Sequence, residues 1–280
     1  MTFRTLLAFY LRRHRTAFWV TLLGIVLHQI LFLYLFRIIV DNPAKAAAIN
    51  SAIPDFVFKL IGLPEFDLRL PRHFVGMYYL RLELRALLFV FGITVASNVV
   101  AGEVGRGTAD LLFSHPVRRR AAVHAGAAAV FLHLLLVSLA LCAGFAVGTR
   151  IFPMGRGQPA LGDLVPSIAS AASGAFVVLL YCLALSSFCR RRAQAVGWSV
   201  AIILVPLILK AISNMQAIPG PGSPVSWISG LFPEHWYRPH HVLWLPGRWT
   251  YWGTVWPLAI QGTIALAVAT TAAERRDLAR

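Results

Sequence analysis

The stretch Ala101-Gly-Glu-Val-Gly-Arg-Gly-Thr-Ala-Asp-Leu-Leu-Phe-Ser-His-Pro-Val-Arg-Arg-Arg120 lies between two long apolar runs. Glu103 closes the first run, and Gly105 and Gly107 permit a turn that other residues resist. Thr108 can cap a new helix, which Pro116 must end. The apolar residues of that helix are Leu111, Leu112 and Phe113. The pattern predicts a short amphipathic helix that a soluble partner can grip, but it fits a plain loop with a basic flank equally well.

The composition of the chain indicates an integral membrane protein. Of its 280 residues, 58% are hydrophobic and only 13% are charged, and the mean hydropathy is +0.68. A soluble domain carries about 25% charged residues. The net charge of +15 comes from arginines that flank apolar runs instead of lining one face. The positive-inside rule and anionic lipid headgroups explain this distribution, so we expect membrane lipids and no nucleic acid as partners.

Six apolar runs approach the length of about 20 residues that a helix needs to cross a bilayer. They cover approximately residues 17–36, 79–100, 122–147, 164–188, 195–211 and 251–273. Because only helices satisfy the backbone over such runs, the predicted fold is all-α, one transmembrane domain over residues 1–280 built as a bundle of six transmembrane helices. Residues 1–15 are predicted to form an interfacial helix, and residues 37–78 and 214–248 form two long loops.

The charges predict how the bundle is oriented. Six spans put both termini on one side, and the short segments on that side are rich in arginine. By the positive-inside rule this side is cytoplasmic, so residues 101–120 face the cytosol and the long loops lie outside. We therefore expect a multi-pass protein of the inner (cytoplasmic) membrane with both termini in the cytoplasm.

Several polar side chains lie at predicted membrane depth. His28 and Gln29 belong to the first span, His133 to the third and Gln261 to the sixth. Such groups pair across helices or line a path, and the sequence leaves both roles open. His28, Gln29 and Gln261 are the candidates for a substrate path.

Ion pairing explains one further charged group. Glu83 lies near the start of the second span, and we expect it to pair with Arg81 or Arg85.

No catalytic or nucleotide-binding pattern is found in the sequence. It lacks a G-x-x-x-x-G-K-[ST] phosphate loop and the G-x-S-x-G nucleophile elbow, so we expect no enzyme activity on this chain. His235, His240 and His241 lie together with Glu234 in the second long loop, where a metal site and an interfacial aromatic belt both remain open. The three cysteines have neither metal-ligand spacing nor a disulfide pattern.

One motif resembles a known family. A span ending in Ala-Gly-Glu103, followed by Gly105-x-Gly107-Thr108, Leu111-Leu112 and His115-Pro116-Val117-Arg118-Arg119, resembles the integral-membrane permease subunits of the ABC-2 family. The order of an N-terminal helix, six spans and a tail with Arg275-Arg276-Asp277 is similar as well. The chain departs from the pattern at His115, where many members carry a small or polar residue.

The resemblance implies a function. Residues 103–116 would form a coupling helix that docks on a separate ATPase subunit of the ATP-binding cassette type, through Glu103, Gly107, Thr108, Leu111, Leu112, Phe113 and Pro116. Two permease copies, identical or different, would work with two ATPases, which would hold ATP and Mg²⁺, while this chain would hold no cofactor. The expected function is the permease of an ATP-driven transporter, with export favoured. The alternative is a membrane-embedded enzyme or assembly factor whose long loops carry the activity.

Overall fold

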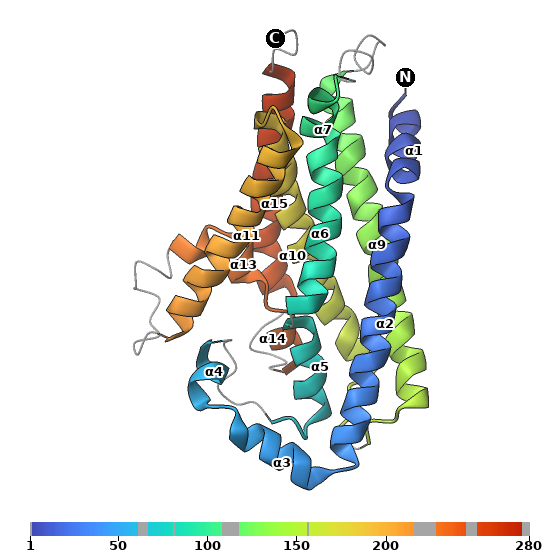
Figure 1. Ribbon diagram of the computed structural model, residues 1–280, viewed down its shortest axis with the longest axis vertical. Helices are drawn as coiled ribbons and strands as arrows, with labels where there is room; N and C mark the ends of the chain where they lie inside the picture. The colour runs from blue at the N-terminus through green and yellow to red at the C-terminus, as the bar shows by residue number, and fades with distance from the viewer. Residues whose placement is uncertain are drawn as a thin grey trace.

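The computed structural model describes residues 2–60, 67–80, 82–107, 118–155, 157–215, 228–244 and 251–275. Over these residues the chain is helical with no strand. Figure 1 shows the long helices side by side in one bundle, with the start of α1 and the end of α15 at the same end. We call this end the terminal end, and the opposite end, where α3 lies, the distal end.

Six helical segments of the described chain are long and apolar enough to cross a membrane, which confirms the predicted fold class. They cover Arg15–Ile39, Pro71–Val99, Arg119–Ile151, Leu161–Phe188, Arg192–Ile212 and Tyr251–Arg275. The corresponding helices are α2 (Arg15–Val40), α5 (Pro71–Leu80) with α6 (Leu82–Val99), α9 (Arg119–Ile151), α10 (Leu161–Phe188), α11 (Arg192–Met215) and α15 (Tyr251–Arg275). Helices α2 and α9 extend beyond the predicted apolar runs 17–36 and 122–147 at both ends, and the extensions carry Arg15, Arg37, Arg119 and Arg150.

The remaining helices are short. They are α1 (Phe3–Arg13), α3 (Pro43–Ala52), α4 (Asp55–Leu60), α7 (Ala101–Gly105), α13 (Pro233–Trp236) and α14 (Pro239–Trp244). The second span begins at Pro71, earlier than the predicted residue 79, because Arg72 and His73 hide the start of α5 in a hydropathy reading. Helix α3 was not predicted, although its Ala-Lys-Ala-Ala-Ala run has high helix propensity.

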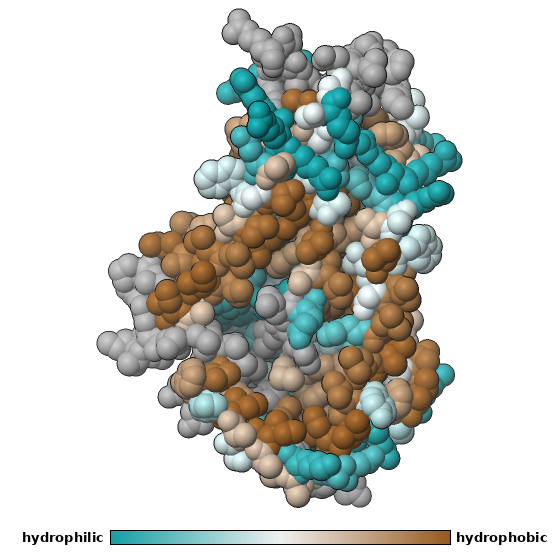
Figure 2. Space-filling model, in the orientation of Figure 1, coloured by the Kyte–Doolittle hydropathy of each residue, from teal (hydrophilic) through white to brown (hydrophobic). Residues whose placement is uncertain are grey.

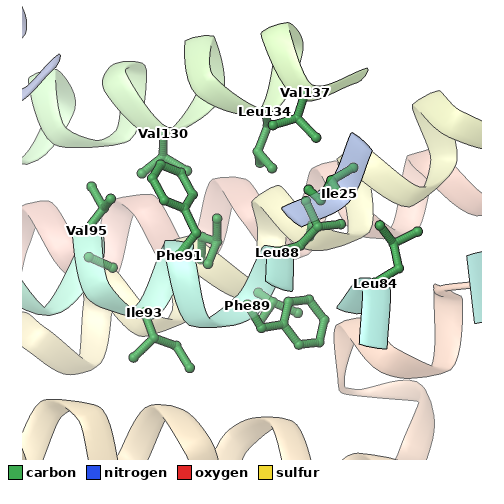
Figure 3. Packing of buried hydrophobic residues seen from close by; sticks show 14 of the residues in the cluster. Ile25, Leu84, Leu88, Phe89, Phe91, Ile93, Val95, Val130, Leu134 and Val137 are labelled. Carbon is green, nitrogen blue, oxygen red and sulfur yellow. The ribbon is translucent and has the colours of Figure 1, made fainter. Parts of the chain in front are cut away.

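The core lies where α2, α6, α9 and α10 meet. Figure 3 shows Ile25, Leu88, Phe91 and Leu134 among the buried side chains that fill this space. The first half of α10 is built of small residues, and Gly174 and Ala175 are buried there. Small residues let helices approach closely, so α10 contacts α6, α9, α11, α14 and α15.

The molecular surface carries the pattern of a membrane protein. Figure 2 shows hydrophilic residues gathered near the terminal end and again at the distal tip, with a broad apolar band between them. Large apolar side chains such as Trp19, Leu23, Trp198 and Trp256 are exposed in that band. Hydrocarbon is the solvent that such a surface requires, so the chain is a multi-pass membrane protein.

Candidate functional site

The predicted coupling segment begins with α7 at the terminal end. Helix α6 ends at Val99, and the separate short helix α7 carries Glu103 in its first turn. The Ala101 N–H donates to Ser186 Oγ of α10 at 3.1 Å, and Ser186 Oγ donates to Ser97 O at 3.4 Å. These bonds tie α7 to the central helix of the bundle. Gly107 follows with a φ of +70°, a conformation that favours glycine, so the chain can turn sharply there.

Glu103 points into the protein and not into solvent. Its side chain is only 6% exposed and forms ion pairs with Arg13 of α1 and with Arg106, the latter at 2.9 Å. Arg106 Nη1 also donates to Asn98 Oδ1 at 3.3 Å. One carboxylate therefore connects the N-terminal helix, the end of the second span and the start of the coupling segment. We call Glu103, Arg13 and Arg106 the terminal cluster.

Helix α1 is fixed beside this cluster. Its first turn is capped by Thr2, and Leu6 and Tyr10 are completely buried where α1 packs against α9. Burial, and secondarily the charge of Glu103, raise the pKa of Tyr10, so the phenol stays protonated. His14 joins α1 to α2 and is buried as well; burial, assisted by Arg13, lowers its pKa to about 4. The imidazole is therefore neutral in the folded protein at neutral pH.

Other predicted coupling residues lie outside the described part of the chain. These are Thr108, Leu111, Leu112, Phe113 and Pro116. The expectation of a coupling helix there stays a prediction. The described part shows how the segment leaves α7, through Glu103 and Gly107, and how it returns at Arg119 as α9.

The predicted path residues contact different elements. Gln29 is buried and its Nε2 donates to Leu141 O of α9 at 2.9 Å, while His28 stacks on Tyr78 with ring centroids 5.3 Å apart. Gln261 Nε2 donates to Gly230 O at 3.2 Å. An apolar groove of about 520 Å³ lies between α9, α10 and α15, and none of His28, Gln29 and Gln261 lines it. A path role for these three residues stays a prediction.

A second ionic cluster, which the sequence analysis missed, lies inside the bundle, where Arg85 is midway along the span Pro71–Val99. Arg85 of α6 forms an ion pair with Glu234 of α13, and Lys210 Nζ of α11 lies 3.9 Å from the same carboxylate. Lys210 Nζ also donates to Glu234 O at 2.8 Å and Tyr237 O at 3.1 Å. The Tyr237 ring lies against the guanidinium, 4.2 Å from Arg85 Cζ, and burial raises the pKa of Tyr237 to about 12. We call Arg85, Lys210 and Glu234 the distal cluster.

The carboxylate paired with Arg85 is Glu234. The expected pairing of Glu83 with Arg81 or Arg85 stays a prediction, since Arg81 lies outside the described residues. A signal for the pairing existed, because Arg85 and Lys210 are cations within apolar spans and such charges need partners. Because Glu234 lies in a loop next to three histidines, the sequence analysis considered it with them as a metal site and not as a partner of Arg85 or Lys210.

The loop histidines make different contacts, although the rings of His240 and His241 lie against each other with centroids 4.1 Å apart. His235 Nδ1 lies 3.0 Å from Ser229 Oγ, whereas His240 is buried against Trp244 with ring centroids 5.3 Å apart. Burial lowers the pKa of His235 to about 4 and holds that of His240 well below its usual value. Within the ranges that the structure covers, no three His, Cys, Asp or Glu side chains gather as a metal site. The geometry therefore favours packing of these rings over metal binding.

Comparison with known proteins identifies the family. A search of curated proteins finds no match. The sequence pattern of the family described as ABC-2 family transporter protein matches residues 15–238, which include five of the six spans together with both ionic clusters except Arg13. The match covers well over half of the chain and agrees with the six-helix architecture. The chain therefore belongs to the ABC-2 family of transporter proteins, as a membrane-spanning permease component.

Proposed function

We propose that this chain is the permease of an ATP-driven exporter and that a separate ATPase subunit drives it through residues 101–120. The terminal end is then cytoplasmic, because it gathers the arginines of the short connections, among them Arg106, Arg119 and Arg191. ATP and Mg²⁺ are held by the ATPase, and a second permease copy completes the transporter in the inner membrane. Export is favoured by the family resemblance of the coupling motif.

The terminal cluster is the observation that carries this proposal. A push on residues 108–117 reaches Glu103 through a single turn of chain. From Glu103 the ion pair to Arg13 leads to α1, and the Ala101–Ser186 hydrogen bond leads to α10. Rigid packed elements with defined contacts are what transmits a displacement between sites. Glu103 thus acts as a positioning residue behind the docking surface, because its carboxylate is not exposed to a partner.

Docking itself is tested by co-purification. The permease is expressed with a candidate ATPase subunit of the ATP-binding cassette type, and the tagged complex is isolated in mild detergent. Replacing Leu111, Leu112 and Phe113 by aspartate should abolish recovery of the ATPase. The new carboxylates would lose their water in an apolar contact and would have no cationic partner there. Aspartate at three exposed positions of α3, Ala44, Ala47 and Ala48, which lie outside the spans, tests whether any surface charge has this effect. Unchanged recovery with the loop variant contradicts the docking site.

Coupling is tested separately with Glu103→Ala. We expect this variant to insert and to retain the ATPase, while ATP hydrolysis no longer responds to candidate substrates across a panel of lipids, peptides and drugs. Glu274→Ala is the matched control, since Glu274 is an exposed carboxylate near the same end, 3.9 Å from Arg120. A Glu103→Ala transporter with normal substrate stimulation shows that the cluster does not transmit the push.

A further inference from the structure

The apolar groove between α9, α10 and α15 faces the hydrocarbon of the membrane. Its volume is about 520 Å³, and none of the described residues that line it is charged. It lies at membrane depth, since its α10 wall runs from Ala169 to Leu180 within the span Leu161–Phe188. On its α9 side, Phe131 and Leu135 are 51% and 45% exposed. A molecule that fills the groove must therefore come from the apolar part of the membrane.

The groove exists because α9 and α15 converge at the terminal end and separate toward the distal end. Near the terminal end, His124 Nε2 of α9 lies 3.4 Å from Thr270 Oγ1 of α15. Farther along, α9 packs closely on α2, where a Cβ added at Gly144 would lie 2.3 Å from Gln29 Oε1. Figure 1 shows α9 and α15 diverging from the terminal end. The space that they leave over α10 is a wedge that narrows toward the terminal end.

The hydroxyl groups in the wall need no partner from an occupant. Ser138, Ser173 and Thr263 line the groove, and each hydroxyl donates at 2.8 Å to a backbone carbonyl one turn earlier in its own helix. The other polar side chain of the described lining is Tyr251, at the distal mouth. Because the walls hold no charge and these hydroxyls are already bonded, the groove favours an occupant that is apolar along most of its length.

The shape of the groove favours a flexible chain over a helix. Its α15 wall runs from Tyr251 to Leu266, which is about 22 Å of helix. The hydrocarbon of one leaflet is about 15 Å thick, half of the bilayer core, so the groove has room for the length of an acyl chain. A helix from a second copy is about 10 Å across and cannot follow a wedge whose walls converge.

The distal mouth carries side chains that suit a lipid headgroup. Tyr251 begins α15, and its neighbour Trp252 is 62% exposed. Tyrosine and tryptophan concentrate where the hydrocarbon meets the headgroups. From this position a phenol can donate to an ester or phosphate oxygen, while its ring stays against the chain. The mouth therefore favours a lipid that enters from the distal side.

We propose that this groove binds one acyl chain of a phospholipid from the leaflet at the distal end, with the headgroup beside Tyr251 and the chain tip near Leu266. The bound chain supplies van der Waals contacts that the walls of an empty groove would lack. It also keeps α9 and α15 at a fixed spacing. This site goes beyond the proposed function, because it requires neither an ATPase nor a transported substrate.

The test is photolabelling of the full chain in nanodiscs made only of phosphatidylcholine. Two diazirine-bearing phosphatidylcholines are added in trace amounts, one with the diazirine near the carboxyl end of an acyl chain and one with it near the methyl end. After irradiation, peptide mass spectrometry gives the labelling of each helix. The reference is the exposed apolar face of α11 at Leu204, Val205 and Ile208, which faces the hydrocarbon outside the groove.

The parent chain should show an excess of label with a defined direction. Groove residues should be labelled about fivefold above the α11 face, the excess that about 1 kcal/mol of packing gives. The probe near the carboxyl end should label Val255, one turn from Tyr251. The probe near the methyl end should label Leu266, because the chain tip reaches the narrow end of the wedge.

Two variants fill the groove from different walls. Ala172→Phe on α10 and Ala259→Phe on α15 each place a ring in the space, since both alanines line it. Each variant should lower labelling of the groove to the level of the α11 face. Ala143→Phe is the matched control, because Ala143 is exposed on α9 outside the groove. It should leave the excess unchanged.

Three results overturn the proposal. Labelling of the groove in the parent chain that does not exceed the α11 face shows that no lipid chain is held there, as when a second copy covers it. The reverse order of the two probes shows that the chain enters from the other leaflet. An excess that survives a filled groove shows that the label comes from lipid outside it. If neither filled variant accumulates, the excess and the probe order in the parent chain decide.

Discussion

The terminal cluster at one end of the bundle and the distal cluster inside it each hold one carboxylate between two cations, but they differ in their access to water. In the terminal cluster the side chains of Arg13 and Arg106 are 25% and 42% exposed around a buried Glu103. In the distal cluster Arg85 and Lys210 are 7% and 15% exposed around Glu234. Water can replace either partner of Glu103 but no partner of Glu234. The loss of one partner should therefore cost less in the terminal cluster than in the distal cluster.

The largest effect on stability should come from the distal cluster, whose side chains have little access to water. Glu234→Gln leaves Arg85 and Lys210 buried without a carboxylate, which costs about 3–5 kcal/mol for a buried pair. The unfolding midpoint of purified protein can be followed with a thiol-reactive dye, because Cys182 and Cys189 are buried until the bundle opens. The exposed ion pair of Asp163 with Arg72 gives the reference. Asp163→Asn should lower the free energy of unfolding by less than about 1 kcal/mol. Similar losses of unfolding free energy from both variants would contradict the expected difference between buried and exposed ion pairs.

The second-largest effect is a dependence of stability on pH, and it arises from His14 at the terminal end. Burial lowers the pKa of His14 to about 4 from an ordinary value of 6.5, so the unfolded chain binds the proton more readily. The resulting stability is present above pH 6.5 and is lost as the pH falls toward 4. Between pH 7 and 5 the loss from this group is about 2 kcal/mol. The charged groups that influence the ring are Arg13, His133, Arg192 and Arg106, all of which disfavour the imidazolium.

His14→Gln isolates this contribution. The variant removes the titrating group, so the difference in unfolding midpoint between it and the parent should shrink as the pH falls from 7 to 5. His124→Gln serves as the control, because His124 is exposed at the same end of α9. A difference that stays constant with pH would show that His14 does not titrate on unfolding.

A smaller effect tests the distal cluster without changing charge. A Cβ added at Gly174 would lie 2.6 Å from Cδ2 of Tyr237, whose ring rests on Arg85. Gly174→Ala should therefore cost about 1–2 kcal/mol through displaced packing. Gly162→Ala in the same helix meets nothing within 4 Å and should be neutral or slightly stabilising. Equal midpoints for the two alanine variants would mean that the ring does not support the cluster.

The sequence predicted the spans well because they depend on local information. The run of α10 contains a single charged residue, Asp163, and its assignment as a span needs no knowledge of its neighbours in space. The pairing of Arg85 with Glu234 joins residues 149 positions apart, and no periodicity connects them. Glu103 shows the same limit at shorter range. The sequence places Arg106 three residues from Glu103. The burial of the Glu103 carboxylate and its ion pair with Arg13, however, depend on how α1 packs against α9.

The smallest effect should come from Arg106, and it sharpens the comparison most. Arg106 pairs with Glu103 three residues away and is the most exposed partner in either cluster. Arg106→Gln should cost about 0.5 kcal/mol or less and nothing in 1 M salt, because an exposed ion pair is screened. Arg13→Gln should cost more and respond less to salt, since Arg13 joins a separate helix to Glu103. If the two arginine variants lose the same stability and respond equally to salt, the Arg13–Glu103 link between α1 and α7 stabilises no more than the local pair does. The displacement that we propose for residues 101–120 must then be transmitted through the Ala101–Ser186 contact alone.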